Sequence, residues 1–126
     1  MDPDPLGGGF AAHAGLTLTH KLLRDHLIEG VLQTDPEEGL RIDQVLIQDA
    51  TGTMVWQQFG RFGIERVQPA VCVTYVDHNM LQTGFENSDD HLYLQSMSYK
   101  HGAIYSRPGN GISHFAHLER FGKPAD

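Results

Sequence analysis

Three short apolar runs, each followed by a stretch with helical periodicity, organise most of the chain. The runs cover residues 45–47, 71–76 and 103–106, and they favour the β-branched and aromatic side chains that strands prefer. They are continuous rather than alternating, which is typical of strands covered on both faces. Strands that alternate with helices form parallel sheets through right-handed crossovers. The pattern therefore predicts an α/β fold with three α/β/α layers around a parallel sheet.

Helices are predicted before, between and after these runs. The first begins near Thr17 or Thr19, carries an apolar stripe at Leu23, Leu27 and Val31, and ends at a turn over residues 35–39. Three more helices follow the strands: one from Thr51-Gly52 to Gly63, one from residues 87–90 to Gly102, and a last one that carries His114, Leu118 and Phe121. Met54, Trp56, Phe59 and Phe62 are predicted to pack in the core.

Composition limits the domain organisation and the class of partner. The 126 residues suffice for one domain, and residues 1–15, rich in Gly, Pro and Ala, are expected to form a flexible tail ahead of a domain over residues 16–126. A net charge of −7 disfavours nucleic acid, which binds through Lys and Arg. Neither a membrane-length apolar run nor a secretory signal pattern occurs. The single cysteine, Cys72, is expected to be a buried, reduced thiol, so a cytoplasmic location is expected.

Polar residues follow all three predicted strands, where a parallel sheet binds its ligands. Gln48 follows the first run, the Asp77-His78 pair follows the second, and His114 lies beyond the third. A carboxylate beside an imidazole stabilises the imidazolium and fixes its tautomer, as a proton donor requires. The bland alternative is that Asp77 and His78 merely satisfy each other, and that Gln48 is a solvated loop residue. Asp49 is expected to order the turn before the next helix.

Three segments carry a resemblance to the aconitase and isopropylmalate dehydratase superfamily. They are Asp43-Gln44-Val45-Leu46-Ile47-Gln48-Asp49-Ala50-Thr51, Tyr75-Val76-Asp77-His78-Asn79 and Ser106-Arg107-Pro108-Gly109-Asn110-Gly111-Ile112-Ser113-His114. The resemblance extends over nearly the whole chain from Leu16, and residues 81–87 look most like the bacterial aconitase-type branch.

The resemblance implies a hydro-lyase that interconverts citrate and isocitrate through cis-aconitate, with a [4Fe-4S] cluster that acts as a Lewis acid on the substrate hydroxyl. It implies that Gln48 contacts the substrate and that Asp77 and His78 protonate the leaving hydroxyl. His114 matches a further active-site histidine. The implied partners are a small tricarboxylate and the rest of an aconitase-type chain.

The chain departs from this family in its cysteines. The family's three cluster cysteines and its Asp-Ser-His-Thr segment are absent, and Cys72 matches no ligand position. We therefore expect residues 16–126 to be the partial, leading part of the cluster-binding domain, truncated before the ligands and inactive alone. Phe115 also replaces the glutamine that often follows the histidine matched by His114.

Three other interpretations remain open from the sequence. The first is the sister activity on isopropylmalate or homocitrate. The second is a catalytically silent fragment that associates with another chain through an open sheet edge. The third is a mononuclear zinc or iron site built from Asp77, His78, His114 and His117, although His117 is expected to lie on the surface.

Overall fold

The computed structural model describes residues 15–30 and 39–123, which fall into two compact units that divide between Ile42 and Asp43. Residues 1–14 of the predicted tail, and residues 35–38 of the predicted first turn, lie outside the described residues.

The first unit contains a shorter helix than the sequence predicts. Helix α1 spans Leu18–His26, and the Thr17 side chain caps it by accepting a hydrogen bond from the His20 backbone N–H at 3.3 Å. Strand β1 (Leu27–Glu29) follows directly and pairs antiparallel with β2 (Gly39–Leu40). The expected continuation of the helix through Leu27 is therefore wrong. Pairing with β2 satisfies the backbone of this segment and overrides the apolar periodicity, while Val31 lies outside the described residues.

The second unit is built on three parallel strands, β3 (Gln44–Gln48), β4 (Val71–Tyr75) and β5 (Ile104–Ser106). They lie in the order β3-β4-β5, so β4 is central, and it is nearly all buried. The register places Gln48 beside Tyr75 and Tyr75 beside Ser106. The carboxyl ends of all three strands therefore share one edge, as the sequence predicts.

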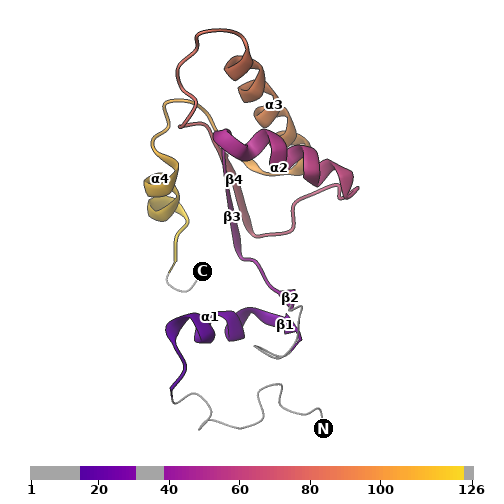
Figure 1. The fold of residues 1–126 in the computed structure, drawn as a ribbon, viewed down its shortest axis with the longest axis vertical. Coiled ribbons are helices and arrows are strands. Elements are labelled where there is room, and N and C mark those ends of the chain that lie inside the picture. Colours follow the sequence, from indigo (N-terminus) through magenta and orange to yellow (C-terminus); the bar gives the residue numbers. More distant parts are fainter. Residues whose placement is uncertain (1–14, 31–38, 124–126) are drawn as a thin grey trace. The chain divides into compact units, whose positions relative to one another are not determined.

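Three helices cover both faces of this sheet. They are α2 (Asp49–Arg61), α3 (Glu86–His101) and α4 (Ser113–Arg120). In Figure 1, α2 and α3 lie on one side of the strands and α4 lies on the other. The α/β class and its layers are thus confirmed. Within the described residues, no helix is long and apolar enough to cross a membrane.

Each face has its own apolar core. The α2–α3 side packs Ile47, Trp56 and Leu94 together with buried Cys72, whereas the α4 side packs Val73, Tyr75 and Ala116. Burial raises the pKa of the Cys72 thiol, in keeping with the expected buried cysteine.

The core face of α2 differs from the predicted one. Trp56 is 1% exposed and Phe59 packs against the same core, but Met54 and Phe62 are 54% and 74% exposed, so their assignment to the core is wrong. Trp56 faces inward because its indole N–H donates to Thr74 Oγ1 at 3.3 Å, and Ser98 donates to the same oxygen at 2.9 Å. Gly52 lets α2 approach Leu94 closely, since a Cβ there would lie 2.8 Å from Leu94 Cδ2.

Candidate functional site

The polar groups at the strand ends gather where β3 and β4 stop side by side. Helix α2 starts at Asp49, directly after β3, and the Asp77-His78 pair follows β4 after a single residue. The parallel register aligns Gln48 with Tyr75, so the two segments leave the sheet at the same level. The topology alone therefore brings carboxylate, imidazole and amide groups to one place.

Asp77 and His78 form a close hydrogen-bonded pair. The His78 Nδ1–H donates to Asp77 Oδ1 at 2.7 Å, and the other oxygen, Oδ2, accepts the Ser113 backbone N–H at 2.7 Å. Burial acts to raise the pKa of Asp77, but hydrogen bonds from Ser113 and His78 together with the His78 charge outweigh it and hold the pKa below its ordinary value. Asp77 is thus ionised and fixes the His78 ring, and Nε2 is the ring nitrogen that can exchange a proton with a ligand.

Asp49 is a second, more deeply buried carboxylate at this site. Its side chain is 1% exposed, and its oxygens accept the backbone N–H groups of His78 at 3.0 Å and Asn79 at 2.8 Å. Asp49 Oδ1 also lies 3.4 Å from His78 Nδ1. It is the first residue of α2, where the helix dipole favours a negative charge, as the sequence predicts. The sequence does not reveal that this carboxylate orders the segment after β4.

His114 and Gln48 complete the predicted set. The ring centroids of His114 and His78 are 5.9 Å apart with the planes nearly perpendicular, so the structure brings these two histidines together. Gln48 ends β3 two residues after Leu46, which packs with the core under α4, so alternation directs Gln48 to that same face. Its Oε1 is buried and has no hydrogen-bond partner in the described part of the chain. A buried, unpaired amide oxygen is a group that a bound hydroxyl or carboxylic acid can satisfy.

His91, on α3, is a member of the site that the sequence analysis missed. Its side chain is 12% exposed, and its Nε2 lies 3.9 Å from Asp49 Oδ2. The buried positions of α3, Leu94, Ser98 and His101, follow His91 at helical spacing. That spacing is the signal that places His91 on the inward face, whereas its neighbours Asp89 and Asp90 suggest a polar helix.

His117 lies apart from this group and is half-buried rather than fully exposed. Because Gln44 Nε2 donates to the Phe121 carbonyl at 2.8 Å, its Oε1 accepts from His117 Nε2–H at 3.0 Å. His117 Nδ1 then accepts the Tyr75 hydroxyl at 3.1 Å. Burial lowers the pKa of His117, so this imidazole is neutral and holds α4 against β3 and β4. The expected surface position is wrong because His117 follows the buried Ser113 and Ala116 of α4 at helical spacing, which places it toward the sheet.

Within the described residues, the predicted ligand set of Asp77, His78, His114 and His117 does not come together as one metal site. Within residues 15–30 and 39–123, the group with ligand atoms close enough for an ion is Asp49, Asp77 and His78, whose atoms lie within 4.8 Å of one another. Their hydrogen bonds already occupy these oxygens, because both Asp49 oxygens and both Asp77 oxygens accept N–H groups. We therefore interpret this group as a hydrogen-bonded network around His78.

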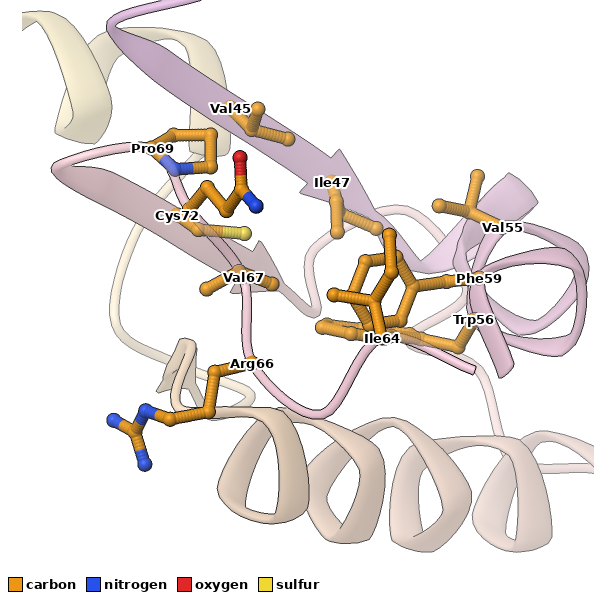
Figure 2. Close-up of a pocket in the computed structure, with 11 residues that line it drawn as sticks. Val45, Ile47, Val55, Trp56, Phe59, Ile64, Arg66, Val67, Pro69 and Cys72 are labelled. Atoms are coloured by element: carbon orange, nitrogen blue, oxygen red, sulfur yellow. The ribbon is translucent and has the colours of Figure 1, made fainter. Parts of the chain in front are cut away.

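An apolar cavity of about 280 Å³ lies elsewhere, between β3, β4 and α2 (Figure 2). Its lining includes Val45, Ile47, Trp56, Phe59 and Cys72. In Figure 2 the Arg66 guanidinium points away from it. A cavity with this lining suits no polyacid, so it is separate from the polar site at the strand ends.

Comparison with known proteins finds relatives of two named activities. The chain is 33% identical over 85 residues to 3-isopropylmalate dehydratase large subunit 2 of Archaeoglobus fulgidus, covering 68% of this chain and 20% of that protein. It is 33% identical over 124 residues to the mitochondrial aconitate hydratase of Schizosaccharomyces pombe, covering 86% of this chain and 16% of that protein. It is 26% identical over 112 residues to 3-isopropylmalate dehydratase large subunit 1 of Thermotoga maritima, covering 89% and 27%. No family model matches the chain. The chain thus spans at most about a quarter of the length of these relatives.

Proposed function

Because this chain belongs to the aconitase and isopropylmalate dehydratase superfamily, we propose that it forms part of a hydro-lyase acting on a hydroxy-polycarboxylate. Among the substrates of this class we propose the citrate and isocitrate pair, with cis-aconitate between them. The aconitate hydratase from Schizosaccharomyces pombe combines 33% identity with 86% coverage of this chain, which supports this choice. The dehydratase subunits cover 68% of the chain at 33% identity in Archaeoglobus fulgidus and 89% at 26% identity in Thermotoga maritima.

The observation that carries the proposal is the Asp77–His78 pair beside His114. His78 Nδ1–H donates to Asp77, so in a protonated ring the Nε2–H is the proton available to a substrate. In the proposed step the substrate C–O bond breaks, His78 gives that proton to the departing hydroxyl, and water leaves. The electrons of a neighbouring C–H bond form the new double bond, and its proton passes to a base outside this site. Gln48 orients the substrate through its buried amide, and His114 contacts it from α4.

The [4Fe-4S] cluster implied by the resemblance does not fit the residues of this chain. A cluster of this type is held by cysteine thiolates, and the chain has one cysteine, Cys72, which is 6% exposed and lies within β4 rather than at the strand ends. We assign the cluster, if the complete enzyme holds one, to residues outside this chain, and derive no step through it.

The test is the enzyme that contains this segment, assayed for hydration of cis-aconitate and, separately, for dehydration of isopropylmalate. The variant His78→Ala should lower kcat by about 10²- to 10⁴-fold with little change in KM, the factor of a general acid. Phe115→Ala, which removes an exposed side chain of α4, is the control and should retain activity. Equal turnover in the His78 variant contradicts the proposed role.

Two competing functions give different results in the same assays. Turnover of isopropylmalate alone identifies the sister activity, which has relatives of its own at 33% identity. An enzyme without activity on either acid, yet bound to a partner chain, identifies a silent interaction segment.

A further inference from the structure

Two largely buried side chains of the second unit, Asp49 and His91, lie next to His78 and have no role in the proposed step. The Asp49 carboxylate, 1% exposed, faces His78 on one side and His91 on the other. Three elements distant in sequence meet there: the start of α2, the segment after β4, and α3. A buried carboxylate requires compensation by hydrogen bonds or charge, so the contacts around Asp49 define its role.

The Asp49 carboxylate binds backbone N–H groups of the segment after β4. It accepts the N–H of His78 at 3.0 and 3.2 Å with its two oxygens, and the N–H of Asn79 at 2.8 Å. These bonds fix the direction in which the chain leaves β4. The same carboxylate lies 3.4 Å from His78 Nδ1, so it constrains the ring as well as the backbone.

His91 supplies the other side of this arrangement. Gln82 Nε2 donates toward His91 Nδ1 at 3.5 Å, which leaves the proton of a neutral ring on Nε2. That atom is buried, lacks a hydrogen-bond partner among the described residues, and lies 3.9 Å from Asp49 Oδ2. A buried N–H group 3.9 Å from a buried carboxylate oxygen attracts that carboxylate electrostatically.

We propose that Asp49 is a positioning residue that orients His78 for proton transfer, and that His91 holds Asp49 in place from α3. This inference rests on the proposed function only for its effect on turnover. The geometric part concerns the backbone and rings of this chain and can be measured without a substrate.

The first test is amide hydrogen exchange by NMR on the 126-residue chain. In the wild type, the amides of His78 and Asn79 should exchange slowly although they follow the end of β4. Asp49→Asn should speed both by about 10- to 100-fold, the factor that a hydrogen bond to a charged group confers. Asp89→Asn removes an exposed carboxylate from α3 and should change neither amide. Fast exchange in the wild type, or exchange within about twofold of wild type in the Asp49 variant, overturns the proposal.

The second test separates packing from hydrogen bonding at His91. His91→Phe keeps a ring but removes the donor, whereas His91→Gln keeps an N–H that can reach Asp49. Exchange of the two amides should accelerate in the Phe variant and return toward wild type in the Gln variant. Equal exchange in all three proteins removes His91 from the proposal, and an unfolded Phe variant leaves the decision to the Gln variant, which must then match the wild type.

The third test uses the active enzyme and distinguishes this inference from the proposed function. Asp49→Asn should lower kcat by at least about 10-fold with KM nearly unchanged, because a misdirected acid affects the chemical step rather than binding. If the exchange results are as expected but the enzyme acts on neither acid, the positioning of His78 by Asp49 and His91 is supported and the proposed function fails. If the enzyme is active and the Asp49 variant has normal kcat, positioning by Asp49 is refuted.

Discussion

Two glycines of helix α2 should respond in opposite directions to the same change, Gly→Ala. In a helix interior, alanine is favoured over glycine by about 1 kcal/mol because it restricts the unfolded backbone. Gly60 has nothing within 4 Å of the position of an added Cβ, so Gly60→Ala should gain part of this, about 0.5–1 kcal/mol.

At Gly52 the same methyl group would collide with the core. Its Cβ would lie 2.8 Å from Leu94 Cδ2 and 3.1 Å from Ile47 Cγ2, and Leu94 is fully buried. Overpacking of this kind costs about 1–3 kcal/mol. Subtracting the gain in helix propensity leaves Gly52→Ala less stable than the wild type by about 1 kcal/mol.

The measurement is urea unfolding followed by far-UV circular dichroism, with the midpoint and the slope fitted together. The midpoint should fall for Gly52→Ala and rise for Gly60→Ala at unchanged slope. The double variant should give the sum, because the two sites have no shared neighbours. A Gly52 variant stabilised as much as the Gly60 variant refutes the tight α2–α3 packing, and with it the spacing that brings Asp49 near His91.

Further predictions concern titration and charge. Burial lowers the pKa of His117, so the folded state binds this proton less readily than the unfolded state; stability should be full above the ordinary value of 6.5 and decline as pH falls below it. His117→Gln should flatten that decline of the urea midpoint below pH 6.5, and a decline as steep as that of the wild type refutes it. Hydrogen bonds hold the pKa of Asp77 below 3.8, so its contribution is present above that value and lost as pH falls through the depressed one. Asp77→Asn should cost about 1–3 kcal/mol at neutral pH, because it removes the charge from two hydrogen bonds; a loss below about 0.5 kcal/mol contradicts this.

Much of the fold could be predicted because it depends on local pattern. The run that forms β4 is apolar and β-branched, and Gly102, with φ of 78°, ends α3 where the sequence places its end. The clustering of His78 with His114 also followed, since parallel strands end at one edge.

The rest of the fold and of the candidate site depends on contacts between residues that are distant in the sequence, which no local pattern encodes. Asp49 serves the segment after β4, 29 residues away, and that pairing follows from the β3–β4 register. His91 and His117 resemble the other histidines in sequence, and only packing against Asp49 and Tyr75 distinguishes them. The end of α1 does not follow from the local pattern, because the residues after His26 pair with β2.

The position of Trp56 has a practical consequence. It is the single tryptophan of the chain, and it is 1% exposed within the second unit, stacked on His101 with ring centroids 5.6 Å apart. Its fluorescence is therefore an intrinsic optical reporter of that unit alone. A red shift in its emission reports the opening of the α2–α3 core and does not respond to melting of the segment before Asp43. Combined with circular dichroism, it distinguishes unfolding of the two units without any label.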